Sequence, residues 1–143
     1  MTIEQIGMMI LQMVAWSLGG ILALFIARLA YNIMTPFDAK KELCDDKNAA
    51  VGASHGMYIV AAAIILHGLI VGERVATEWY IEMGVMAVMY VIALVMLWLG
   101  RVALRALVPF NLDEEIHIKD NLAVGLVEGA SYLGFAIIVH SAL

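Results

Sequence analysis

The stretch of sequence that decides the fold is Pro36-Phe37-Asp38-Ala39-Lys40-Lys41-Glu42, which leads to Asn48-Ala49-Ala50-Val51-Gly52 and then to Gly56. The same pattern returns 73 positions later without a gap, as Pro109-Phe110-Asn111, Glu115, Asn121-Leu122-Ala123-Val124-Gly125 and Gly129. A pattern that recurs at one fixed offset is the signature of an internal repeat, which has to be recognised before the fold is assigned. We therefore interpret the chain as a tandem duplication.

The same offset holds on both sides of this repeated motif. Upstream, Arg28 corresponds to Arg101, and downstream a short run matches: Ala63, Ile64, Ile65 and His67 correspond to Ala136, Ile137, Ile138 and His140. A chain of 143 residues has room for one domain. We predict a single domain over residues 1–143, with repeat 1 over about residues 1–72 and repeat 2 over about residues 73–143.

The composition places this domain in a membrane. Hydrophobic residues make up 64% of the chain and the mean hydropathy is +0.93, far outside the range of soluble domains. The net charge is −5, and no basic face gathers the few Lys and Arg residues, so we expect no nucleic-acid partner. The single cysteine, Cys44, has no second cysteine with which to form an internal disulfide.

Long apolar stretches predict the membrane spans. A helix needs about 20 residues to cross a hydrocarbon core of about 30 Å. Four stretches are long enough: 5–27, 48–72, 83–100 with a continuation to 107, and 121–143. The fold class that follows is an all-α membrane protein with four transmembrane helices, built from two tandem helical-hairpin repeats.

A short polar helix is expected after the first helix of each hairpin. Pro36 and Pro109 end the preceding helices, because proline has no N–H to donate and clashes with the turn before it. Asp38 and Asn111 follow as predicted N-caps, since their side chains accept hydrogen bonds from free N–H groups. Each repeat motif therefore predicts an interfacial helix between two spans.

Basic residues near the helix ends predict the orientation. They gather at the two turnarounds that carry the motifs, whereas only Arg74 lies in the connection between the repeats; the gathered residues are Arg28, Lys40, Lys41, Lys47, Arg101, Arg105 and Lys119. Lys and Arg are enriched on the cytoplasmic side of membrane proteins. We expect the motifs in the cytoplasm, both termini outside, and two hairpins of the same polarity related by an axis along the membrane normal.

The doubled motif resembles that of a known family. Pro-Phe-Asp or Asn, a Glu four residues on and then Asn-x-Ala-Val-Gly, present in both halves, are similar to the bacterial inner-membrane family called domain of unknown function 350, the YjfL-like proteins. The resemblance covers nearly the whole chain. It implies a small multipass protein of the bacterial inner membrane with a duplicated unit, and it implies no activity, substrate or catalytic residue.

Ionisable residues inside the spans are the first candidate site. Counting residues from the helix ends places Arg28, His55, Arg101 and Glu128 at a similar depth, just inside the cytoplasmic leaflet. Arg101 and Glu128 are expected to meet as an ion pair. Such residues are expensive in a bilayer, so they are paired and often functional. The layer either fixes helix register, with arginines that reach the headgroups, or serves a conducting or proton-handling path.

Small residues are the candidate packing positions of the second helix in each repeat. Glycines spaced four apart let helix backbones approach closely in lipid. The predicted packing pairs are Gly52 with Gly56 and Gly125 with Gly129. The remaining residues of the repeat motif that we single out are Pro36, Phe37, Glu42, Asn48, Pro109, Phe110, Glu115 and Asn121.

His67 and His140 form a second pair related by the repeat, near the outer face. If the fold brings them together, two imidazoles could bind a haem iron, or copper or zinc with help from an acidic residue such as Glu73, Glu78 or Glu82. The alternative is a hydrogen bond between the two rings at the interface. Two histidines without a supporting motif are a weak signal, so we predict no cofactor.

The function expected from these features is not enzymatic. No nucleophile stands beside a base, and neither a phosphate-binding glycine loop nor a metalloprotease motif occurs in the sequence. We expect a homo-oligomeric membrane scaffold or permeation unit. The alternatives are a haem- or metal-binding electron-transfer subunit that uses His67 and His140, and a structural anchor for cytoplasmic membrane-stress proteins that recognise Glu42 or Glu115.

Overall fold

The computed structural model describes residues 2–73 and 76–143, and over these residues the chain is helical and contains no strand. The elements are α1 (Ile3–Met34), α2 (Ala39–Cys44), α3 (Ala49–Val71), α4 (Trp79–Leu107), a single π-helical turn η1 (Glu114–Ile118) and α5 (Leu122–Ser141). The helices α1, α3, α4 and α5 are long and apolar enough to cross a membrane. The predicted all-α fold with these spans is confirmed. Arg74 lies outside the described residues.

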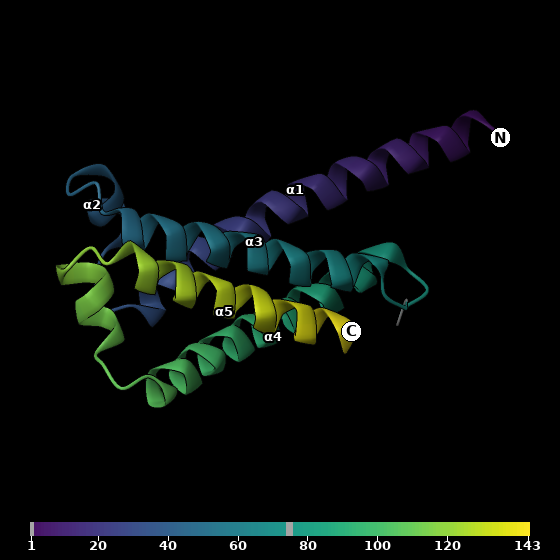
Figure 1. Cartoon of the computed structure of the whole chain (residues 1–143). Helices are drawn as coiled ribbons and strands as arrows, with labels where there is room; N and C mark the ends of the chain where they lie inside the picture. Colours follow the sequence, from purple (N-terminus) through teal and green to yellow (C-terminus); the bar gives the residue numbers. More distant parts are fainter. Residues whose placement is uncertain (1, 74–75) are drawn as a thin grey trace.

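The helices α3 and α5 run parallel to each other through the middle of the bundle (Figure 1). The helix α4 packs against α5 and α3, and α1 packs against α3 and α4. The two short elements α2 and η1 lie together at one end, and both chain termini point toward the other end (Figure 1). The repeated motifs are therefore neighbours in space as well as equivalents in sequence.

Each predicted helix end is explained by short-range chemistry. The helix α1 ends at Met34, one residue before Thr35 and Pro36. The carbonyl of Tyr31 accepts from both the backbone N–H of Thr35, at 3.1 Å, and the Thr35 hydroxyl, at 2.9 Å, which closes the last turn of α1. Asp38 then accepts from the N–H of Lys40 at 2.8 Å and begins α2, as predicted.

The second copy of this turn is looser. Asn111 accepts from the N–H of Glu114 at 3.3 Å, and the short helix that follows is one π-helical turn rather than an α-helix. The two copies of the motif therefore differ in the geometry of the interfacial helix.

An asparagine begins the second span of each half in the same way. Asn48 accepts from the N–H of Val51 at 2.9 Å, and Asn121 accepts from the N–H of Val124 at 3.4 Å. The residues before them, Lys47 and Asp120, have positive φ angles of 54° and 47°. This left-handed conformation turns the chain sharply into the N-cap.

A glutamate six residues earlier fixes each of these asparagines. The Asn48 amide group donates to Glu42 at 3.1 Å, and the Asn121 amide group donates to Glu115 at 2.8 Å. In both copies the backbone N–H of the asparagine also donates to the carbonyl of that glutamate, at 2.9 Å. Glutamate and asparagine therefore act as one unit that closes the loop between the interfacial element and the span.

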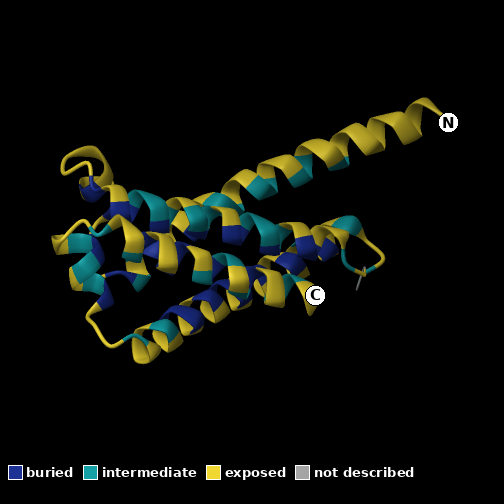
Figure 2. Cartoon of the chain, in the orientation of Figure 1, coloured by how far each residue is buried: buried dark blue, intermediate teal, exposed yellow. Residues whose placement is uncertain are grey.

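Burial is concentrated between the central helices, whereas the N-terminal half of α1, which we call its outer half, stands away from the bundle (Figure 2). Only Ala27 and Tyr31 of α1 are buried, and both lie near its C-terminal end. Along α3 and α5 the small residues Ala50, Ala61 and Ala136 are fully buried, so the two backbones can approach each other closely.

The two glycine pairs take different roles in this packing. A Cβ atom at Gly125 would lie 2.8 Å from the Cα of Ala50, and one at Gly129 would lie 2.9 Å from the Cβ of Met57. In contrast, Gly52 faces Leu43 at an ordinary 3.4 Å, and Gly56 has no atom within 4 Å of that position.

Within this chain, Gly52 and Gly56 therefore do not have the helix-packing role that was predicted for them. Only the second pair brings α3 and α5 together. The physical reason is that α3 and α5 do not meet through equivalent faces, because the glycine face of α5 lies against the face of α3 that carries Ala50 and Met57.

We predict opposite effects for two glycine-to-alanine substitutions. Gly125→Ala forces a methyl group into the Ala50 backbone and should destabilise the fold by about 1–3 kcal/mol. Gly84→Ala adds a methyl group in open space on α4 and should stabilise the helix by up to about 1 kcal/mol. Thermal unfolding in mild detergent, followed by circular dichroism, measures both changes. Equal effects of the two substitutions would contradict the close approach.

Candidate functional site

A buried ion pair lies between α4 and α5. The Nε of Arg101 donates to Oε1 of Glu128 at 2.8 Å, and the two residues are 1% and 0% exposed. Both lie within helices that can span the membrane. A charged pair in this environment is stable only when the remaining donors and lone pairs are also satisfied.

The rest of the Arg101 guanidinium is satisfied by two other segments. One Nη atom donates to the carbonyl of Met34, at the end of α1, at 3.1 Å, and the other lies 2.5 Å from Oδ1 of Asp113. The second oxygen of Asp113 pairs with Arg105 at 2.9 Å. The cluster thus contains two guanidinium and two carboxylate groups. The Arg101 side chain alone joins α1, α4, α5 and the segment before η1.

The remaining oxygen of Glu128 receives a hydrogen bond from the hydroxyl of Ser54, on α3. The hydroxyl of Tyr31 lies 3.0 Å from the same Ser54 oxygen. Because the Ser54 proton points to the carboxylate, Tyr31 must be the donor in that second bond. A hydrogen-bonded chain therefore runs from Tyr31 through Ser54 to Glu128.

We call these residues the polar network: Tyr31, Ser54, Arg101, Asp113 and Glu128. Sequence reasoning missed Tyr31, Ser54 and Asp113. Asp113 stands in an acidic run that looks like a solvated loop. For Ser54 the available signal was its place beside His55 inside an apolar stretch, where a polar side chain needs a partner.

The structure brings together only part of the predicted polar layer. Arg101 and Glu128 meet, whereas the Arg28 side chain is exposed and lies outside the polar network. His55 is half-buried, its ring centroid lies 4.6 Å from that of Tyr31, and the charge of Arg28 acts on it. The physical reason is that the carboxylates of Glu128 and Asp113 already surround Arg101, and among the described residues no acidic side chain forms an ion pair with Arg28.

Tyrosine rings pack around this network. The centroid of Tyr58 lies 5.2 Å from that of Tyr31 and 5.1 Å from that of Tyr132. The hydroxyls of Tyr58, Tyr90 and Tyr132 are buried and have no hydrogen-bond partner within the described part of the chain. An unsatisfied buried polar group costs about 1–3 kcal/mol, so these hydroxyls are places where water or another polar group can bind.

The two repeat motifs hold each other at the end of the bundle. The Asn48 amide group donates to the carbonyls of Ile116 and His117, at 3.0 and 3.1 Å. Asp120 accepts from the N–H of Ala50 at 2.9 Å. Oε1 of Glu42 lies 3.0 Å from Nδ1 of His117, within ion-pair distance but without hydrogen-bond alignment. The second copy of the repeat motif, which we call motif 2, therefore helps to cap the first turn of α3.

The other motif residues differ in burial between the halves. Phe37 is buried and stacks on the ring of His117 at 5.1 Å, whereas Phe110 is exposed. Pro36 and Pro109 are both exposed at the ends of the long helices. Hydrogen bonds from Lys119 and Asn121 hold the pKa of the half-buried Glu115 carboxyl below its ordinary value. Glu115 is therefore ionised at neutral pH.

His67 and His140 meet at the other end of α3 and α5. Nδ1 of His67 lies 3.3 Å from Nε2 of His140, the ring centroids are 5.6 Å apart, and the rings are nearly parallel, with an angle of 12°. The separation of the centroids equals the nitrogen–nitrogen distance plus the radius of each ring, so the rings face each other edge to edge. In the described residues no group of three or more His, Cys, Asp or Glu side chains could hold a metal ion.

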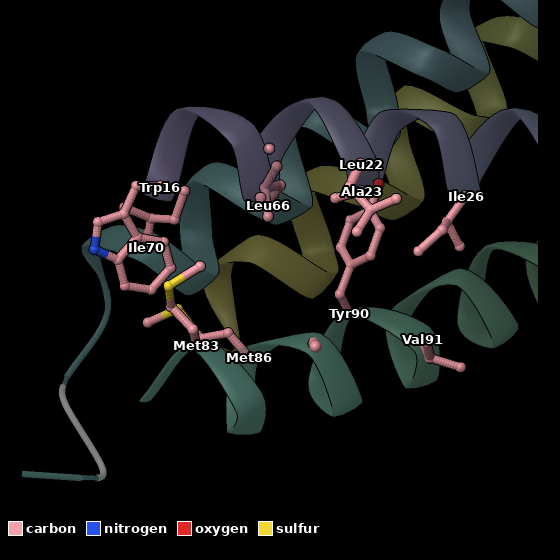
Figure 3. Close-up of a pocket in the computed structure, with 13 residues that line it drawn as sticks. Trp16, Leu22, Ala23, Ile26, Leu66, Ile70, Met83, Met86, Tyr90 and Val91 are labelled. Atoms are coloured by element: carbon pink, nitrogen blue, oxygen red, sulfur yellow. The ribbon is translucent and has the colours of Figure 1, made fainter. Parts of the chain in front are cut away.

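Two apolar cavities lie between α1 and α4, away from the polar network. Their volumes are about 240 and 270 Å³, and Ile26 and Val91 line both. The ring of Tyr90 extends from α4 toward α1 across the first cavity, which Trp16 closes at the outer end (Figure 3). Neither Arg101 nor Glu128 lines these cavities.

A comparison with known families assigns the chain. The family model described as Domain of Unknown Function (DUF350) matches residues 4–143. The chain belongs to this family. The resemblance based on the two motifs is thereby confirmed, and this DUF350 chain acquires no activity from the family description. Neither the curated proteins nor the solved structures contain a significant match.

We predict that substitutions of Arg101 and Glu128 have non-additive effects on the free energy of unfolding. Replacing Arg101 by leucine leaves the Glu128 carboxylate buried without its counter-charge and should destabilise the protein by about 3–5 kcal/mol, whereas replacing Glu128 by leucine leaves Arg101 paired with Asp113 and should cost less. Replacing both should cost less than the sum of the single changes, because no unpaired charge remains. Unfolding of the two single variants and the double variant in detergent measures this coupling. Additive effects would show that the two side chains do not depend on each other.

Proposed function

We propose that this DUF350 protein is a non-enzymatic, self-associating scaffold of the bacterial inner membrane. The observation that supports it is the closure of the polar network: the guanidinium of Arg101 is bonded to Glu128, Asp113 and a backbone carbonyl. A fully paired buried charge fixes one arrangement of helices and does no chemistry of its own. The protein therefore contributes a rigid, apolar-surfaced unit to the membrane.

A scaffold is favoured over a permeation path through a single chain. The two cavities between α1 and α4 are lined by apolar residues, and the charged pair is 0–2% exposed. An ion or polar solute needs polar lining groups that can replace its water. On this proposal, any permeation runs between copies of the chain rather than through one.

Self-association is supported by the surface that α1 presents. Its outer half carries large exposed apolar side chains and stands away from its own bundle (Figure 1). Gln12 is a half-buried polar residue in this half, and it lines a cavity together with Trp79 and Glu82 of its own chain. A glutamine within a membrane span is stabilised by a hydrogen bond to a neighbouring helix. The helix α4 lies beside Gln12 within the chain, so it is the exposed apolar side chains of α1 that a second copy would cover.

The proposed orientation places the repeat motifs in the cytoplasm and both termini outside. Motif 2 exposes Glu114 and Lys119, which could contact a soluble partner, and this supports the alternative of a membrane anchor for cytoplasmic proteins. The electron-transfer alternative has less support. His67 and His140 use their facing nitrogens to bond each other, and a porphyrin would have to pass between them.

The scaffold and the permeation unit are separated by one conservative substitution. Glu128→Gln removes the buried negative charge and leaves Asp113 as the carboxylate that pairs with Arg101. As a scaffold, the protein should lose stability and oligomer, and liposomes containing the wild-type protein should show no ion flux above that of empty liposomes. Native mass spectrometry from mild detergent measures the oligomer. Wild-type flux that Glu128→Gln alters while the oligomer survives would refute the scaffold.

A further inference from the structure

The contact between α3 and α5 joins unlike faces of two similar helices. The glycine face of α5, with Gly125 and Gly129, packs on the face of α3 that carries Ala50 and Met57. On α3 the equivalents of these glycines are Gly52 and Gly56, and on α5 the equivalents of Ala50 and Met57 are Ala123 and Ala130. The contact is therefore heterologous: one element offers its glycine face and the other its alanine face.

A heterologous contact inside the chain leaves one face of each kind unused. On α3, Gly56 is exposed with no atom near it and Gly52 is half-buried. On α5, Ala123 and Ala130 are both exposed. These free surfaces are complementary in the way that the two buried surfaces are, because they carry the same kinds of small residue at the equivalent positions.

The contact between His67 and His140 is asymmetric in the same way as the contact between the two helices. His67 uses Nδ1 and His140 uses Nε2, so the two equivalent residues contribute different atoms. A two-fold axis between the helices would have paired like atoms, whereas nearly parallel rings at 12° indicate a shift from one helix to the next. The nitrogens left over are Nε2 of His67 and Nδ1 of His140, which again form a complementary pair.

We propose that a second copy of this chain docks head to tail on these free surfaces. Gly52 and Gly56 of one copy pack on Ala123 and Ala130 of the next, as Gly125 and Gly129 pack on Ala50 and Met57 within the chain. His140 of the second copy then faces His67 of the first and extends the row of imidazoles. This inference rests on the proposed self-association and gives it a contact on α3 and α5, in addition to the exposed surface of α1.

The two faces lie on opposite sides of each helix. Residues two positions apart, such as Ala50 and Gly52, are separated by about 200° around the helix axis. Successive copies therefore continue the row of α3 and α5 helices rather than turning back on it. A head-to-tail contact of this kind produces a closed ring when the small rotation between copies adds up to a full turn, and a filament when it does not.

The polar end of the contact between copies differs from that within the chain. Asp120 accepts a hydrogen bond from the first turn of α3, but its equivalent in the other motif is Lys47, which cannot accept one. His117 likewise corresponds to Cys44. The contact between copies therefore depends on helix packing more than the internal contact does.

Disulfide cross-linking tests this interface. In a Cys44→Ser background, which removes the exposed native thiol, the pair Gly56→Cys and Ala130→Cys is introduced into one chain and oxidised in native membranes. Unlike positions should meet between copies, so a ladder of covalent dimers, trimers and larger species is expected on a non-reducing gel. Either substitution alone should leave the protein monomeric on that gel. Gly52→Cys with Ala123→Cys gives a second, independent pair.

A matched control replaces Ala130→Cys by Val102→Cys, an exposed position of α4 beside Arg101 and therefore close in depth to Glu128. This control should give no ladder. An oligomer in native mass spectrometry without cross-links from either pair would overturn the head-to-tail interface and leave self-association standing. A monomer would overturn both. Strong dimers from Gly56→Cys alone would overturn the inference by showing a symmetric contact.

Discussion

A guanidinium group buried among hydrocarbon side chains has to be neutralised and hydrogen-bonded, because an unpaired charge there is far more costly than any single packing contact. Arg101 meets this requirement with partners from three other segments: Glu128 on α5, Asp113 before η1 and the last carbonyl of α1. The mutual positions of those segments therefore depend on one side chain. The tyrosines and Ser54 then fill the space around Glu128, and the apolar cavities remain separate from this polar centre.

Much of this arrangement could be predicted from the sequence, because charged residues within apolar stretches are conspicuous. Counting residues from the helix ends placed Arg101 and Glu128 at one depth, and the structure pairs them. Tyr31 and Ser54 could not be identified in this way, since whether a neutral polar side chain faces the bundle or the lipid depends on how the helices are rotated. Asp113 was missed because an acidic run before a short helix has the pattern of a solvated loop, and only the fold brings it to Arg101.

The repeat determines the helix caps of both copies, but it does not determine which residues pack against another helix. Asn48 and Asn121 cap their helices in the same way, because each cap depends on atoms within a few residues. The glycines four positions apart are also repeated, yet Gly129 touches a neighbouring helix and Gly56 does not. Identical motifs acquire different environments here because α3 and α5 present unlike faces to each other. The sequence alone does not tell which copy of a motif will be inside.

The length of α1 makes its tilt depend on the thickness of the membrane. The helix α1 has 32 residues and α5 has 20, so at about 1.5 Å per residue their lengths are about 48 and 30 Å. The shorter helix matches a hydrocarbon core of about 30 Å, whereas the longer one can remain within it only by tilting. The divergence of α1 from the bundle supplies such a tilt (Figure 1). Bilayer thickness then sets the angle of α1, and a thicker or thinner membrane would change how far its outer half reaches from α3 and α4.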